Sequence, residues 1–183
     1  GHTVSIGAEE SGTERNATQI LEFAGMPSSL VATKNLDYIE ATKELKAGDI
    51  DAFFCTAGLT TTVIDELSKE CDIRLIPLTD TVISKMLESS LAYTSEVIPA
   101  GTYTGQTTDI STIGVKSVLI TKSDVSDDTI EQLTSLLFEK ENEISYSNSL
   151  KLELTYDFAT DDIPIPFHDG AKRYYKACGY STN

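Results

Sequence analysis

Hydrophobic residues in the first half of the chain alternate between short apolar runs and longer stretches with helical spacing. The apolar runs, at residues 4–7, 50–55 and 73–78, predict buried strands. Helical spacing covers residues 13–24, 38–47, 60–69 and a segment around 82–87. Because strands separated by helices of about ten to fifteen residues form βαβ units, the pattern predicts an α/β fold with a mainly parallel sheet.

The pattern changes after residue 92. Residues 93–110 contain Pro99, two glycines and many threonines without helical periodicity, and we interpret them as a crossover between two lobes. Beyond them we expect one strand at 111–121, a helix from a Ser126 cap to about residue 143, and a helix at 170–178. Since one strand cannot form a sheet alone, we expect its partners in sequence that precedes Gly1.

The charge balance excludes some partners and the cysteines give no motif. Lysine and arginine number 14 against 29 acidic residues, a net charge of 14 − 29 = −15, which disfavours nucleic acid and anionic lipid as partners. No segment has the roughly 20 apolar residues of a membrane-spanning helix, and the chain does not open with a signal peptide. The number and spacing of Cys55, Cys71 and Cys178 fit neither a disulfide framework nor a zinc site, and we expect no metal and no cofactor. The sequence leaves open whether Cys55 and Cys71 form a disulfide.

The loop between the first predicted strand and helix has features of an anion-binding site. Ser11 and Glu14 have the spacing of a capping box, in which we expect the Glu14 carboxylate to reach back to Ser11. The N–H groups of Gly12 and Thr13, the Thr13 hydroxyl and the helix dipole all favour a carboxylate. Asn16, one turn along, adds a neutral donor. On spacing alone, a capped helix that binds nothing remains the alternative.

Two later segments are candidates to complete this site. The loop after the strand at 50–55 opens at the carboxyl edge of the sheet, where open parallel sheets bind ligands. Its Ala57 and Gly58 offer backbone groups, and Thr60 is expected to cap the next helix. Farther on, Tyr103 lies in a glycine-flanked segment and fits equally a core residue and a wall of a cleft.

The residues give weak support for an enzyme. The two histidines are His2 and His168, and the chain contains neither a G-x-S-x-G nor an H-E-x-x-H motif. We interpret His168 as a loop residue hydrogen-bonded to the backbone. A hydrolase built on Ser11 and His168 is the least favoured alternative, because nothing marks an acid partner or an oxyanion hole.

Five segments occur in a set order along nearly the whole chain. They are Ser11–Glu14 with Asn16, Gly48–Phe54 with Ala57–Gly58, Cys71–Leu75, Ile98–Tyr103 with Gly105–Gln106, and Ile165–His168 with Gly170–Ala171 and Tyr174–Tyr175. Together they resemble the TAXI family of solute receptors, which serve tripartite ATP-independent periplasmic (TRAP) transporters.

This resemblance implies a type II periplasmic-binding fold, in which two α/β lobes close on a ligand. Residues 1–106 would form the inserted second lobe, and residues 107–183 the C-terminal part of the first. The protein would be extracytoplasmic, in the periplasm or lipid-anchored at the outer face of the membrane. It would deliver glutamate, glutamine or another small carboxylate to the TRAP membrane subunits.

The resemblance also implies which residues bind the ligand. It assigns the ligand's anionic group to Ser11, Gly12, Thr13 and Asn16, and further contacts to Ala57, Gly58 and Tyr103. At two positions the chain departs from the family pattern. Glu10 stands where many relatives have glycine, and an inward-facing carboxylate there would favour an amino acid over a plain dicarboxylate. Thr104 stands where proline is common. A ligand-sensing regulatory domain of the same fold is the main alternative function.

Overall fold

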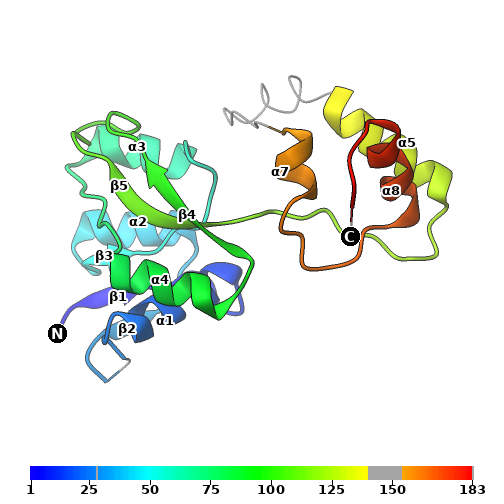
Figure 1. Cartoon of the computed structure of the whole chain (residues 1–183). Helices are drawn as coiled ribbons and strands as arrows, with labels where there is room; N and C mark the ends of the chain where they lie inside the picture. The colour runs from blue at the N-terminus through cyan, green and yellow to red at the C-terminus, as the bar shows by residue number, and fades with distance from the viewer. Residues whose placement is uncertain (28, 140–153, 183) are drawn as a thin grey trace. The chain divides into compact units, whose positions relative to one another are not determined.

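The computed structural model describes residues 1–27, 29–139 and 154–182. The chain divides into two compact units, Gly1–Gly114 and Val115–Asn183 (Figure 1). That the units correspond to the two lobes expected on either side of residue 106 stays a prediction. All of the residues assigned to the candidate site belong to the first unit.

A parallel three-stranded sheet lies at the centre of the first unit. Its strands are β1 (Thr3–Ser5), β2 (Ala32–Lys34) and β3 (Ala52–Phe53), in the spatial order β2-β1-β3. Val4 of β1 lies beside Thr33 of β2 and beside Ala52 of β3. The predicted α/β class with a parallel sheet is therefore confirmed, although β2 was not expected.

Four helices accompany this sheet, as the spacing predicted. They are α1 (Gly12–Phe23), α2 (Tyr38–Ala47), α3 (Thr62–Glu70) and α4 (Asp80–Ser89). Helix α1 packs with α4 and α2 packs with α3 (Figure 1). The expectation that Thr60 caps α3 is wrong, because the N-cap is Thr61 and its side chain makes no capping hydrogen bond.

The core of the first unit gathers along the inner face of α1. Ala17, Ile20 and Leu21 are buried at helical spacing, as the pattern predicted. Ala17 and Leu21 cluster with Ile6, which follows β1, whereas Ile20 clusters with residues of α4. Phe54 contacts both clusters. Burial of this face anchors α1 against the end of β1.

Two segments of the first unit differ from expectation. Residues 73–78 were predicted to be a strand, but in the described chain their one backbone hydrogen bond to a strand joins Leu78 N to Ser111 O at 2.9 Å. An apolar run without a ladder of such bonds is not a strand. Conversely, the crossover interpretation missed β4 (Tyr93–Ile98), which pairs with β5 (Ile110–Val115). Its tyrosine, threonine, valine and isoleucine are strand-favouring residues.

The strand predicted at 111–121 is shorter than expected. Strand β5 ends at Val115, and in the described chain no strand pairs with the residues that follow it. Leu119 and Ile120 are 68% and 73% exposed. The apolar run is strand-like in composition, but it lacks a neighbour that would supply a ladder of hydrogen bonds.

The second unit contains α5 (Asp127–Glu139), α7 (Tyr156–Thr160) and α8 (Asp169–Ala177). Ser126 caps α5 as expected, since its Oγ accepts from Thr129 N at 3.2 Å; the expected end of that helix near 143 lies outside the described residues. Helix α5 packs against α8. The buried side chains of α5 are Ile130 and Thr134, whereas Leu133 and Leu136, which lie at helical spacing from Ile130, are 40% and 48% exposed. Within the described residues α5 packs mainly on α8, and it therefore buries only a narrow face.

Candidate functional site

The first turn of α1 and the loop after β3 start at the same edge of the sheet, because β1 and β3 are parallel neighbours. The chain leaves β1 through α1 towards β2, and then returns through α2 to β3 on the other side of β1. Open α/β sheets bind ligands beyond the carboxyl ends of their strands at such a reversal, and the order 2-1-3 places it between β1 and β3. The topology therefore brings together the two loops that the sequence singled out.

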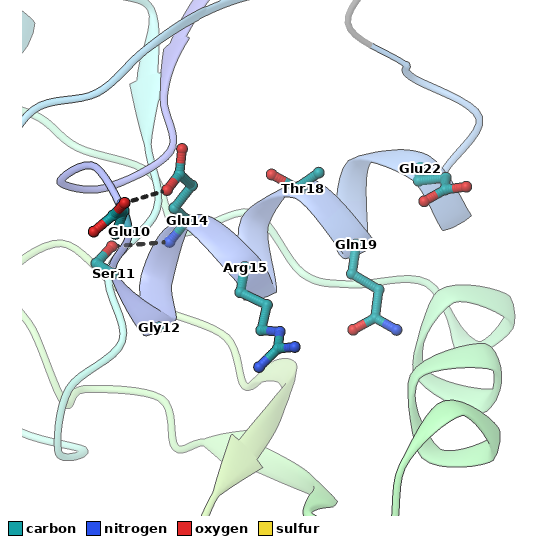
Figure 2. A pocket seen from close by; sticks show the side chains of 8 residues that line it. All are labelled: Glu10, Ser11, Gly12, Glu14, Arg15, Thr18, Gln19 and Glu22. Carbon is teal, nitrogen blue, oxygen red and sulfur yellow. Dashed lines mark hydrogen bonds between the residues drawn. The ribbon is translucent and has the colours of Figure 1, made fainter.

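Hydrogen bonds close the turn that precedes α1. Ser11 Oγ accepts from Glu14 N at 3.1 Å, and Glu14 Oε2 accepts from Glu10 N at 2.7 Å (Figure 2). The expectation that Glu14 reaches back to Ser11 is wrong by one residue, because Ser11 N already donates to Ala8 O at 3.1 Å. The two side chains of the capping box thus satisfy the N–H groups of Glu10 and Glu14, and the Ala8 carbonyl satisfies that of Ser11.

Two backbone N–H groups in this turn have no hydrogen-bond acceptor in the described structure, and we call them open N–H groups. Within the described residues, neither Gly12 N nor Thr13 N has a hydrogen-bond acceptor. Gly12 is exposed, and no heavy atom lies within 4 Å of the place where a Cβ would stand. Because unpaired N–H groups and the helix dipole both attract negative charge, this turn can accept a carboxylate oxygen.

The Thr13 side chain, in contrast, points into the protein. Thr13 is only 6% exposed, and its Oγ1 lies 2.8 Å from the hydroxyl of Tyr38. Tyr38 donates its single hydroxyl proton to Thr56 O at 2.9 Å, so Thr13 is the donor in the contact with Tyr38. The hydroxyl assigned to a ligand is therefore already hydrogen-bonded, whereas the Thr13 backbone N–H is not.

Tyr38 connects the two loops, and sequence reasoning missed it. Besides donating to Thr56 O, its hydroxyl accepts from Thr56 N at 3.0 Å. The neighbouring Cys55 thiol is partly buried, and this burial raises the pKa of Cys55 to about 11, with a smaller opposing effect from its hydrogen bond to Tyr38. All three cysteines are free thiols, so the Cys55–Cys71 disulfide is absent. Tyr38 is the first residue of α2, and no local motif marks it as a site residue.

Asn16 also uses its side chain within the protein. Its Nδ2 lies 3.4 Å from Thr56 Oγ1, and its Oδ1 accepts from the Tyr93 hydroxyl at 2.9 Å. Asn16 is partly exposed. The structure therefore places it beside the loop after β3, with both ends of its amide already hydrogen-bonded.

The loop after β3 presents its middle to solvent. Ala57 and Gly58 are exposed, and their backbone N–H groups make no hydrogen bond within the described chain. Tyr103 is buried, with 6% of its surface exposed, and this burial raises its pKa. Its hydroxyl donates to Leu59 O and accepts from Thr61 N at 3.2 Å. Of the two interpretations of Tyr103, the core residue fits this burial.

An open hollow runs along the exposed side of α1 and takes in Ser11 and Gly12 from the predicted set (Figure 2). Its lining residues are Glu10, Ser11, Gly12, Glu14, Arg15, Thr18, Gln19 and Glu22. Arg15 and Gln19 project from the same side of the helix (Figure 2). The hollow thus contains three carboxylates and one guanidinium. Attraction of an anion to this place must come from the open N–H groups rather than from net side-chain charge.

The residues of the hydrolase alternative both cap helices. Ser11 caps α1, and His168 Nδ1 accepts from Gly170 N at 3.1 Å at the start of α8. The interpretation of His168 as a loop residue bonded to the backbone is confirmed. Across residues 1–27, 29–139 and 154–182, no three His, Cys, Asp or Glu side chains gather as a group able to hold a metal. Nor does any helix in those ranges have the length and apolar character needed to cross a membrane.

Replacing Glu10 by glycine is expected to stabilise the protein by about 0.5–1 kcal/mol. Glu10 has φ 60°, in the left-handed region where a side chain costs about 1–2 kcal/mol. Glycine removes this cost, but it also has a larger conformational entropy in the unfolded chain, which offsets part of the gain. Urea denaturation measures the change. Glu9→Gly is the matched control, because Glu9 does not have a positive φ and should lose stability. Equal losses for both variants would contradict the expectation.

A model of the NMT1-like family matches residues 1–179 of the chain. The matched range runs from before β1 to just past the end of α8 and covers all but the last four residues. It therefore takes in both compact units, and within the first unit it includes both loops of the candidate site.

Proposed function

Because the chain belongs to the NMT1-like family, a family of solute-binding proteins, we propose that it is an extracytoplasmic receptor for a small carboxylate or amino acid of the glutamate or glutamine type. We further propose that it delivers this solute to the membrane subunits of a TRAP transporter. The family includes solute receptors of the TAXI type, which the five sequence segments resemble. It is a family of binding proteins rather than of enzymes.

The observation that supports this proposal is the pair of open N–H groups at Gly12 and Thr13 beside the loop of Ala57 and Gly58. The turn with Gly12 and Thr13 and the loop with Ala57 and Gly58 both lie at the carboxyl edge of β1 and β3. N–H groups stay donors at every physiological pH, and binding through them needs no lysine or arginine. A protein of net charge −15 can thus bind an anion at a local neutral receptor.

Glu10 favours an amino acid over a plain dicarboxylate as the ligand. Its carboxylate lines the same hollow as Ser11 and Gly12 (Figure 2). Close to a bound dicarboxylate it would add repulsion, whereas it attracts an ammonium group. A ligand with one carboxylate at the first turn of α1 and an ammonium group towards Glu10 meets both conditions, and glutamate and glutamine have this pattern.

Isothermal titration calorimetry with L-glutamate, L-glutamine and succinate tests the proposal. We expect a dissociation constant in the micromolar range, on the order of 8 kcal/mol of binding free energy, for at least one amino acid, and weaker binding of succinate. The absence of micromolar binding across a broad panel of small carboxylates would overturn the proposal.

We expect Thr13→Ala to weaken binding about ten-fold, and Thr60→Ala to change it less than about two-fold. The first substitution removes the hydrogen bond to Tyr38 and loosens the turn that carries the open N–H groups. Thr60 is exposed and its side chain has no hydrogen bond in the described structure, so it is the matched control. The same titrations measure both variants. If both variants lost equally little affinity, the assignment of the anion-binding site to this turn would be wrong.

A further inference from the structure

Two tyrosine hydroxyls hold the loop after β3 at its two ends, and they do so in the same way. Tyr38 donates to Thr56 O and accepts from Thr56 N, at 2.9 and 3.0 Å. Tyr103 donates to Leu59 O and accepts from Thr61 N. Each hydroxyl thus satisfies one carbonyl and one N–H. Ala57 and Gly58 lie between the two held ends, and the described structure gives their N–H groups no partner.

Both tyrosines come from elements outside the loop. Tyr38 opens α2, where Asp37 caps the helix by accepting from Glu40 N at 2.8 Å. Tyr103 is buried in the segment after β4. That segment is anchored by Gln106, whose Nε2 lies 3.0–3.2 Å from three backbone carbonyls, and by the 3.3 Å bond from Thr104 N to Ser68 Oγ of α3. The conformation of the loop therefore depends on neighbours distant in sequence.

Tyr38 has an additional contact that Tyr103 lacks. It receives the hydrogen bond of Thr13, which is in the first turn of α1. One hydroxyl therefore joins the turn with open N–H groups at Gly12 and Thr13 to the loop with open N–H groups at Ala57 and Gly58. Asn16 adds a second, longer link from α1 to Thr56.

We propose that Tyr38 and Tyr103 are positioning residues for the ligand of this site, because their hydroxyls hold the loop after β3 beside the first turn of α1. This inference rests on the proposed function and adds to it the two groups that organise the site. Neither hydroxyl needs to touch the ligand. A loop that is already ordered binds without a further loss of conformational entropy, so removing either hydroxyl weakens binding.

The test compares Tyr38→Phe, Tyr103→Phe and the control Tyr180→Phe. Each variant loses one hydroxyl and keeps its ring, and Tyr180 belongs to the second unit with no hydrogen bond of its hydroxyl in the described structure. Amide hydrogen exchange by NMR without ligand reports on the loop itself. Titration with L-glutamate reports on binding. Thermal unfolding shows whether each variant remains folded.

We expect exchange to speed up at Thr56 in Tyr38→Phe and at Thr61 in Tyr103→Phe. Affinity for L-glutamate should fall about ten-fold in the first and about three-fold in the second, and stay unchanged in the control. A double-mutant cycle then pairs Tyr38→Phe with Thr13→Val. Because the two hydroxyls bond each other, the combined loss of affinity should be smaller than the product of the single losses.

Wild-type affinity in both tyrosine variants would overturn the positioning role, and so would unchanged exchange at Thr56 and Thr61. If Tyr38→Phe or Tyr103→Phe lowered the affinity only in proportion to a loss of folded protein, the role would also be refuted. If the wild-type protein itself bound no L-glutamate, the proposed ligand would fail. The predicted effects on affinity for L-glutamate would then also be wrong. Amide hydrogen exchange at Thr56 and Thr61 would still show whether the two hydroxyls hold the loop.

Discussion

Replacing Gly170 by alanine is expected to destabilise the second unit by about 3 kcal/mol. A Cβ at this position would stand 2.2 Å from the carbonyl oxygen of Asp127 and 3.0 Å from Glu131 N, both backbone atoms of α5. Backbone cannot move aside as the end of a side chain can, so α8 would have to shift away from α5. Helix propensity alone predicts the opposite sign, because alanine stabilises a helix by about 1 kcal/mol over glycine.

Thermal and urea unfolding of Gly170→Ala measure this loss. Gly12→Ala is the matched control for stability, since Gly12 is also helical and no heavy atom lies within 4 Å of its Cβ position. That variant should be as stable as the wild type or slightly more stable. A neutral or stabilising effect of Gly170→Ala would show that α5 and α8 are not packed as closely as the structure places them.

Gly7→Ala is expected to cost about 3 kcal/mol of stability and to weaken ligand binding at the same time. Gly7 has φ 99°, a conformation that side chains rarely adopt. Its Cβ would stand 2.7 Å from the Cβ of Thr13, which is buried and hydrogen-bonded to Tyr38. The substitution therefore strains the backbone and also displaces the turn that holds the open N–H groups of α1.

Comparison with Gly105→Ala separates the cost of backbone strain from the cost of the clash with Thr13. Gly105 has φ 80°, but no heavy atom lies within 4 Å of its Cβ position, so this variant should show the backbone cost of about 1–2 kcal/mol without the clash. Urea denaturation compares the two variants, and titration with L-glutamate shows the effect on the site. Equal losses of stability would mean that the contact between Gly7 and Thr13 contributes nothing.

Helices were predicted well because their signals are local. Spacing located α1 to α4 within about two residues at each end. Gly25 and Gly48, which follow α1 and α2, have the positive φ of helix stops. The capping box of α1 was recognised but misplaced by one residue at Glu10. Which N–H the Glu14 carboxylate reaches depends on the turn from Gly7 to Ser11, and that turn is set by packing against Thr13.

Strands were predicted less well because a strand needs a neighbour. Residues 73–78 and 116–121 are as apolar as true strands, yet the described chain gives neither of them a ladder of hydrogen bonds. The three residues of β2 carry no clear pattern, but they lie against β1 in parallel register. Apolar composition indicates what can be buried, and only the tertiary arrangement decides which backbone groups meet.

The sequence alone determined the α/β class, the helices of the first unit and the place of the turn whose N–H groups at Gly12 and Thr13 stay open. These properties follow from spacing, capping and glycine positions within a few residues of one another. Only the tertiary structure turned the Thr13 hydroxyl inward, buried Tyr103 and brought Tyr38 between the two loops. Such contacts join residues 18 to 44 positions apart in sequence, and no local pattern encodes their geometry.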